Sequence, residues 1–174
     1  FIEKYNLTIS ELNDKKKTWK TVLHQERSKR HKPRLDDKVL TSWNALMIKG
    51  YIDAYRVFDN PRFLDAAVKN ATFILDQQLK DDGGLFHNFK DGKSTINGYL
   101  EDYAAVIEAF LSLYENTLDE KWLVNSRDLT NYVFDHFYND TTTLFYFTSD
   151  DDSKLVTRST EYRDNVISSS NSIM

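Results

Sequence analysis

The strongest constraint on the fold is a helical pattern that occurs twice along the chain. Residues 42–58 and 100–114 place apolar side chains on two faces of a helix. Residues 61–79 and 120–137 place them on one face only. Because a helix that is apolar on two faces must be covered on both, the pattern predicts two inner helices that alternate with two outer helices.

The two copies keep a regular spacing. Asn44, Asp102 and Asn171 stand at equivalent positions in successive inner helix starts, which gives periods of 58 and 69 residues, the differences between these numbers. Repetition on this scale is typical of stacked helical pairs. The sequence therefore predicts an all-α fold, a curved α/α array with short β-hairpins between the pairs.

Turn residues follow each outer helix. A first hairpin is expected over residues 85–89, with Asp91-Gly92 as its turn. A second β-like segment is expected at 144–147, with a partner near 155–158. Both hairpins are expected to reach over the end of the array where the inner helices begin.

Capping residues give the expected helix starts. Asn60-Pro61 and Asp119 precede the two outer helices. The hydroxyl of Thr41 or Ser42 is expected to cap the first inner helix. A thinner apolar stripe predicts a leading helix at about 10–29.

The composition excludes several classes of protein. An apolar content of 40% indicates a folded globular chain, and a net charge of −4 gives no basic field for nucleic acid. The absence of cysteine excludes disulfides and thiolate chemistry within these residues. No apolar run is long enough to span a membrane. We expect a cytoplasmic protein.

The chain reads as an excerpt of a longer protein, because it begins without an initiator Met and stops where a third inner helix begins. We expect one partial domain over 1–174: a leading helix at 1–30, helical pairs at 42–79 and 100–137, and the start of a third pair at 170–174. Incomplete covering of the inner helices predicts exposed apolar surface and self-association.

A dense polar junction, Arg27 to Asn44, precedes the first inner helix. Arg27, Arg30 and Arg34 would share one face if the leading helix continued this far, but Pro33 indicates that this helix ends near Arg30. Two interpretations of the acidic residues that follow stay open. They cap a helix start and pair with the arginines, or they converge with the arginines and an indole on a small polar ligand.

All inner helices of such an array run in the same direction, so their polar first turns meet at one opening. Carboxylates, amides and aromatic rings at one rim suit the binding of sugar rings. Carboxylates at helix starts also have a structural explanation, since they interact favourably with the helix dipole. The candidate rim residues are Arg34, Asp36, Asp37, Lys38, Trp43, Asn44, His87, Glu101, Asp102, Tyr103, Glu161, Arg163, Asp164 and Asn171.

Three strings carry a resemblance to a known family. They are R..R..P..DDKVLTSWNALMI over 27–48, GYLEDYAAVIEAFLSLYE over 98–115 and EYRDNVISSSNSIM over 161–174. The chain resembles the spermatogenesis-associated protein 20 and YyaL family, although serines at 168–170 stand where that family more usually has Pro-Ser-Gly. The resemblance implies a thioredoxin-like domain followed by an α/α toroid similar to those of N-acylglucosamine 2-epimerases and cellobiose epimerases. It also implies closure of the array into six helical pairs.

Two enzymatic hypotheses follow from these residues and this resemblance. A glycoside hydrolase needs one protonated and one ionised carboxyl group, which Asp37 and Asp102 could provide. A sugar epimerase needs an acid/base pair, and the resemblance implies histidines in that role. His87 is the one rim histidine, and a single histidine is more often structural, so epimerase histidines would have to come from other parts of the protein. No metal or cofactor is expected.

A different class of function is a non-catalytic scaffold. Helical arrays commonly present a concave surface to a protein partner. Here that partner would be another protein or the thioredoxin-like domain of the same parent chain. The candidate ligand otherwise is a small carbohydrate, and the reaction stays unassigned because fold analogy alone cannot choose it.

Overall fold

The computed structural model describes residues 2–153 and 156–174, which form two compact units divided after Asp36. The first unit contains helices α1 (Ile2–Tyr5) and α2 (Ile9–Ser28). Thr8 and Glu11 form a capping box at the start of α2, so the predicted leading helix is confirmed. No residue of α2 is buried within its unit.

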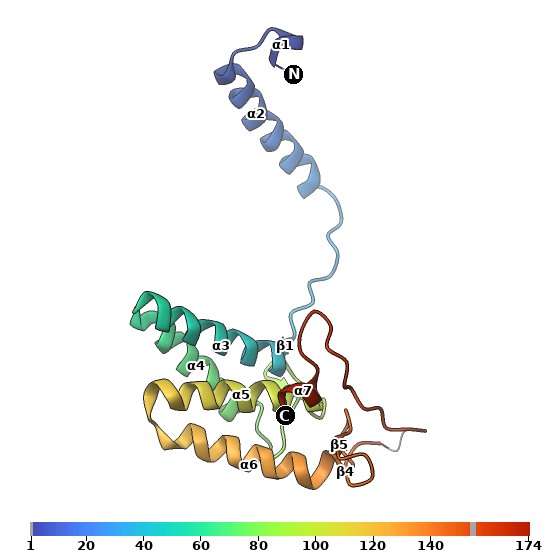
Figure 1. Ribbon diagram of the computed structural model, residues 1–174. Coiled ribbons are helices and arrows are strands. Elements are labelled where there is room, and N and C mark those ends of the chain that lie inside the picture. The colour runs from blue at the N-terminus through green and yellow to red at the C-terminus, as the bar shows by residue number, and fades with distance from the viewer. Residues whose placement is uncertain (1, 154–155) are drawn as a thin grey trace. The chain divides into compact units, whose positions relative to one another are not determined.

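The second unit is an array of helices in which inner and outer helices alternate (Figure 1). Helix α5 packs between α3 and α6, and α4 packs against α3. A short helix, α7, packs against α5. The bounds are α3 (Thr41–Phe58), α4 (Pro61–Gln77), α5 (Leu100–Thr117), α6 (Glu120–Phe137) and α7 (Ser170–Ile173). These helices occupy the ranges expected for two helical pairs and the start of a third.

The two inner helices differ in how they are covered. Helix α5 buries both of its apolar faces, with Tyr103 and Phe110 on one and Val106 on the other. Helix α3 buries only the face that carries Ile48, while Met47 on its other face is 53% exposed. The predicted exposed apolar surface is therefore present on α3, and self-association stays a prediction.

Aromatic side chains hold α5 against α6. The rings of Tyr103 and Tyr132 stack at a centroid distance of 5.4 Å, and Phe137 meets Tyr103 edge-on at 5.1 Å. Phe110 and Trp122 lie 5.2 Å apart farther along the same two helices. Such pairs add about 1 kcal/mol each to the free energy gained by burial alone.

A three-stranded antiparallel sheet, in the order β1-β2-β3, lies beside the helix starts. Strands β2 (Asn88–Lys90) and β3 (Lys93–Ser94) form the predicted hairpin, and both residues of its Asp91-Gly92 turn have positive φ. The addition of β1 (Val39–Leu40) to this hairpin was not expected from the sequence. Through it, the two residues directly before α3 are fixed to the first hairpin.

The second hairpin differs from its prediction. Strand β5 (Leu144–Phe145) pairs with β4 (Tyr138–Asn139), directly after α6. The predicted partner near 155–158 is therefore wrong where it is described, because 156–158 form no strand and Leu155 lies outside the described residues. The chain turns back within a few residues, so the nearer segment takes the strand position.

Backbone hydrogen bonds repeat between the two pairs. The N–H of Thr41 at the start of α3 donates to the carbonyl of His87, at 2.9 Å. The N–H of Leu100 at the start of α5 donates to the carbonyl of Phe147, also at 2.9 Å. Each inner helix start is thus bound to the hairpin region that follows its own pair.

Side-chain caps were predicted correctly for the outer helices only. Asn60 accepts from the N–H of Arg62, and Asp119 accepts from that of Lys121. The prediction for α3 is wrong, because neither the Thr41 nor the Ser42 hydroxyl caps it. The cap comes instead from a carboxylate of α5. No described helix is long and apolar enough to cross a membrane.

Candidate functional site

A pocket of about 340 Å³ opens where three inner helices begin. It is lined by the first three turns of α3 and α5, by α7, and by the segment that precedes α7. The predicted meeting of three distant helix starts at one opening is thereby confirmed. The lining residues are Ser42, Trp43, Leu46, Lys49, Glu101, Ala105, Glu108, Glu161, Val166, Ile167, Ser168, Ser170 and Ile173.

The pocket combines an exposed ring with polar groups. The indole of Trp43 is 69% exposed, and Lys49 forms an ion pair with Glu108 that connects α3 to α5. Glu161 accepts hydrogen bonds from the N–H and the hydroxyl of Ser170, which fixes the segment before α7 onto that helix. The wall therefore offers both an aromatic face and hydrogen-bonding groups.

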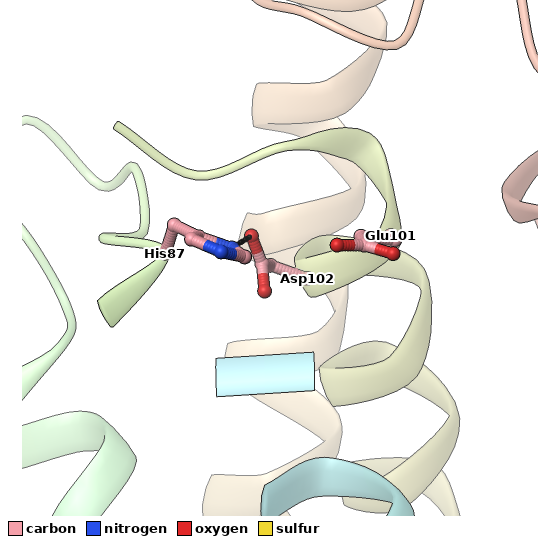
Figure 2. A group of neighbouring side chains, drawn as sticks. All are labelled: His87, Glu101 and Asp102. Carbon is pink, nitrogen blue, oxygen red and sulfur yellow. Dashed lines mark hydrogen bonds and ion pairs between the residues drawn. The ribbon is translucent and has the colours of Figure 1, made fainter. Parts of the chain in front are cut away.

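Asp102 is the residue that holds this end of the array together. Its side chain is fully buried, and Oδ1 accepts from the Ser42 N–H of α3 at 2.9 Å. Oδ2 accepts from the Tyr99 N–H and from His87 Nδ1, each at 2.9 Å. Figure 2 shows Asp102 between His87 and Glu101. One carboxylate thus joins both inner helix starts to the first hairpin.

The burial of Asp102 corrects its predicted role. A group with no exposed surface cannot touch a substrate, and both of its oxygens already accept hydrogen bonds. The sequence pattern showed a carboxylate in a first turn but could not show the backbone N–H groups that surround it. Asp102 is a positioning residue for the pocket rather than its catalytic acid.

His87 is fixed by this carboxylate. The hydrogen bond to Asp102 raises the pKa of His87 above its usual value, and partial burial opposes that effect. Glu101 raises the same pKa through its charge, and Lys38 lowers it. The imidazole also lies against the ring of Tyr99, at a centroid distance of 4.8 Å. Asp102 and Tyr99 together therefore fix the orientation of the His87 ring.

Glu101 is the carboxyl group of this cluster that lines the pocket. Burial raises its pKa, and the charges of Asp102 and Glu161 raise it further, against an opposing effect of His87. Within the described part of the chain, Glu101 has no hydrogen-bond or ion-pair partner. It is a half-buried carboxyl group that stays protonated to higher pH than an exposed glutamate, which suits a general acid.

Other predicted site residues have structural roles. Tyr103 is fully buried and its hydroxyl accepts from the Leu85 N–H at 2.8 Å, so its predicted contact with a ligand is wrong. Asn44 donates to the Leu40 carbonyl at 2.8 Å. Asn171 donates to the carbonyls of Phe145 and Glu161, at 3.0 and 2.7 Å. The two asparagines therefore anchor the starts of α3 and α7.

The remaining candidates lie outside the lining of the pocket. Asp37 is half exposed and forms an ion pair with Lys90 of β2. The Asp164 carboxylate accepts from the Ser169 N–H at 2.9 Å, which lowers its pKa. Arg34 and Asp36 belong to the first unit, and their predicted role stays a prediction.

Two charged lining residues were missed, although the sequence contains a signal for them. Lys49 stands seven residues after Ser42, and Glu108 stands seven after Glu101. Residues spaced by seven share a face of a helix two turns apart. The pocket continues down that face, beyond the first turn of each helix.

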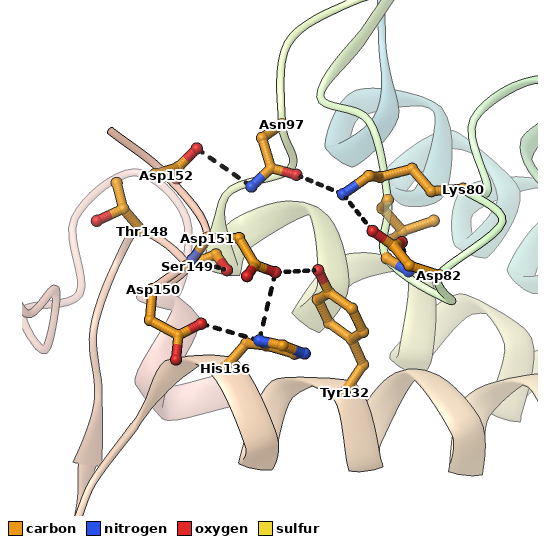
Figure 3. A network of polar contacts seen from close by, with 12 residues as sticks. Lys80, Asp82, Asn97, Tyr132, His136, Thr148, Ser149, Asp150, Asp151 and Asp152 are labelled. Atoms are coloured by element: carbon orange, nitrogen blue, oxygen red, sulfur yellow. Dashed lines mark hydrogen bonds and ion pairs between the residues drawn. The ribbon is translucent and has the colours of Figure 1, made fainter. Parts of the chain in front are cut away.

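A second histidine and carboxylate cluster lies where α6 meets the loop at 149–152 (Figure 3). His136 Nδ1 lies 2.8 Å from Asp150 and 3.4 Å from Asp151. Asp151 also accepts from the Tyr132 hydroxyl at 3.2 Å. These contacts fasten the loop to α6.

Each cluster has the donor atoms of a metal site. The ligand atoms of His87, Glu101 and Asp102 lie within 4.8 Å of one another, as do those of the cluster around His136. In the first cluster, both oxygens of Asp102 accept hydrogen bonds from backbone N–H groups, and the Nδ1 atom of His87 lies within hydrogen-bond distance of one of them. A metal ion would have to displace that hydrogen bond.

Comparisons with known proteins relate the chain to part of much longer relatives. No protein-family model matches it. It is 30% identical over 143 residues to uncharacterised protein B0495.5 of Caenorhabditis elegans, covering 78% of this chain and 20% of that protein. It is 36% identical over 111 residues to human spermatogenesis-associated protein 20, covering 58% and 14%. The chain thus spans about a fifth or less of these relatives.

Solved structures show the same fold. A sugar epimerase from a ruminal bacterium superposes with a TM-score of 0.62 at 15% identity, covering 74% of this chain and 34% of the epimerase. A glycoside hydrolase family 76 mannosidase of Bacteroides thetaiotaomicron superposes at 0.60 and 15%, covering 68% and 32%. The inner and outer helices therefore form part of an α/α toroid. The chain is homologous to a segment of spermatogenesis-associated protein 20, so the resemblance to that family is confirmed.

Proposed function

We propose that the pocket at the starts of α3, α5 and α7 binds a carbohydrate. The observation that carries the proposal is the pairing, in one cavity, of the exposed Trp43 indole with the Glu101 carboxyl group, which has no partner among the described residues. Indole faces pack against the apolar faces of sugar rings, and a carboxyl group bonds their hydroxyls.

The names of the structural neighbours support the same substrate class. They include a cellobiose 2-epimerase of Bacillus thermoamylovorans, a D-mannose isomerase and a family 76 mannosidase. At 15–19% identity these proteins share the fold with the chain. A shared fold does not establish a shared activity, so carbohydrate binding has to be tested.

If the parent protein is an enzyme, Glu101 is its acid/base residue in our proposal, in place of the predicted Asp37 and Asp102 pair. Hydrolysis and epimerisation both need a group that gives and takes a proton near neutral pH, and a raised pKa suits Glu101 to that task. Glu161, on the opposite segment of the lining, supplies a second carboxylate. Asp102 would act through His87 and the helix starts that it fixes.

The test is binding of neutral mono- and disaccharides to the full-length protein, measured by calorimetry and tryptophan fluorescence. Trp43→Ala and Glu101→Gln should each weaken binding about tenfold or more. Phe58→Ala is the matched control, because it removes an exposed aromatic ring from the other end of α3. Absence of binding at millimolar sugar with a folded sample would contradict the proposal.

A scaffold is the second candidate, supported by the uncovered face of α3. Met47 and Phe58 are 53% and 67% exposed there, on a helix whose opposite face is buried. This surface suits a protein partner or the family's thioredoxin-like domain. Under this alternative, Phe58→Ala weakens partner binding, while Trp43→Ala leaves it unchanged. The predicted cytoplasmic location belongs to either proposal.

A further inference from the structure

We infer that the pocket selects uncharged sugars and discriminates against sugar phosphates and sugar carboxylates. The inference rests on the proposed binding of carbohydrate and specifies the substrate class. It is drawn from the charges of the lining residues and from the partners that those charges have.

The lining carries an excess of negative charge. Three of its residues are glutamates, at positions 101, 108 and 161, and one is a lysine, Lys49. The lining contains no arginine and no histidine. Sites that bind phosphate or carboxylate groups usually provide arginine, lysine or a row of backbone N–H groups.

The one cation of the lining is already neutralised. Lys49 forms an ion pair with Glu108, across the two inner helices. His87 lies behind the lining and its charge is matched by Asp102, at 2.9 Å. Neither group is left to bind an anionic substrate.

Two carboxyl groups remain without a cation. Among the described residues, the Glu161 carboxylate accepts hydrogen bonds only from Ser170, and Glu101 has no partner. The two carboxyl groups are close enough for Glu161 to raise the pKa of Glu101. A phosphate placed in this pocket would add to that repulsion, whereas sugar hydroxyls would donate hydrogen bonds to the same oxygens.

The experiment compares mannose with mannose 6-phosphate, and N-acetylglucosamine with its 6-phosphate, on the full-length protein at pH 7 and low salt. We expect each phosphate to bind at least about tenfold more weakly than its parent sugar. In Glu101→Gln that ratio should fall, and raising the salt concentration should reduce it in the wild type. Glu120→Gln, an equal change of charge at the exposed start of α6, should leave the ratio unchanged.

The possible outcomes distinguish the inferred selectivity from the proposed carbohydrate binding on which it rests. Phosphates that bind as tightly as the parent sugars, or more tightly, would overturn the inference and leave carbohydrate binding intact. If Glu101→Gln leaves the tenfold ratio unchanged, repulsion by the Glu101 carboxyl group is not the cause of the selectivity. If neither class of sugar binds, both the inference and the proposed function are refuted.

Discussion

The two histidine and aspartate pairs of this protein have nearly the same geometry and very different surroundings. His87 Nδ1 lies 2.9 Å from Asp102, and His136 Nδ1 lies 2.8 Å from Asp150. The Asp102 side chain is fully buried, whereas that of Asp150 is 55% exposed. Two pairs with almost the same internal distance thus differ in burial and in the number of other groups that bond to the same carboxylate.

The difference arises from where each aspartate lies along the chain. Asp102 is in the first turn of a helix that is covered on both faces, so its oxygens meet the N–H groups of two helix starts. Asp150 is in a loop of three consecutive aspartates beside α6, where water can replace its partner. The first pair therefore organises the pocket, and the second fastens a loop.

Truncation of the two aspartates gives the largest expected contrast. Asp102→Ala leaves the buried N–H of Ser42 and the part-buried N–H of Tyr99 without an acceptor, so we expect a loss of about 3 to 5 kcal/mol in the free energy of unfolding. Asp150→Ala should cost less than about 0.5 kcal/mol, since its pair is exposed. Urea unfolding of both variants measures the difference. Equal losses would show that burial does not distinguish the pairs.

The stacked tyrosines provide a second contrast, because one hydroxyl belongs to each region. The Tyr103 hydroxyl accepts from the buried Leu85 N–H at 2.8 Å, and that of Tyr132 reaches Asp151 at 3.2 Å. Tyr103→Phe should cost about 1 to 3 kcal/mol, since it leaves a buried N–H unpaired. Tyr132→Phe should cost less than about 1 kcal/mol, because the exposed carboxylate can bond water. Both phenylalanine variants keep the ring stack, so thermal unfolding isolates the hydroxyls.

The sequence predicted the elements of this fold better than the links between them. Asn60 and Asp119 cap helices that begin one residue later, and the Asp91-Gly92 turn closes a hairpin between adjacent strands. These signals are local, so the residues alone determine them. The order of two-sided and one-sided helices also follows from local periodicity, and it was enough to predict the common opening.

The parts that could not be predicted depend on contacts between distant segments. Asp102 was expected at the rim, and its cap on Ser42 joins residues 60 positions apart. Helix propensity and dipole arguments place a carboxylate in a first turn, but they do not say which N–H groups surround it. The same limit explains the addition of β1 to the first hairpin, because a two-residue strand has no periodic signal.

The pH dependence of the His87 pair gives a smaller effect. The bond to Asp102 raises the pKa of His87 in the folded state, above the usual value of about 6.5. The stability that it contributes, about 1 kcal/mol, is therefore fully present below about pH 6.5 and is lost as the pH rises through the raised value. The measurement is the difference in unfolding free energy between wild type and His87→Gln from pH 5 to 9. A difference that grows with pH would contradict the assignment.

The smallest effect on the free energy of unfolding is expected at Glu101. Its sign is opposite to that expected for Asp102, the next residue. Burial raises the pKa of Glu101, so the ionised carboxylate destabilises the folded state once the pH exceeds its unfolded value, about 4.3. Glu101→Gln removes that penalty and should stabilise the protein at pH 7 by up to about 1 kcal/mol, with the gain vanishing near pH 4. Asp128→Asn, at an exposed pair on α6, is a control expected to change stability by less than about 0.5 kcal/mol. A residue that lowers stability at neutral pH and lines a pocket is characteristic of a site kept for function. If Glu101→Gln were destabilising at pH 7, Glu101 would be a structural group like Asp102, and the contrast between them would disappear.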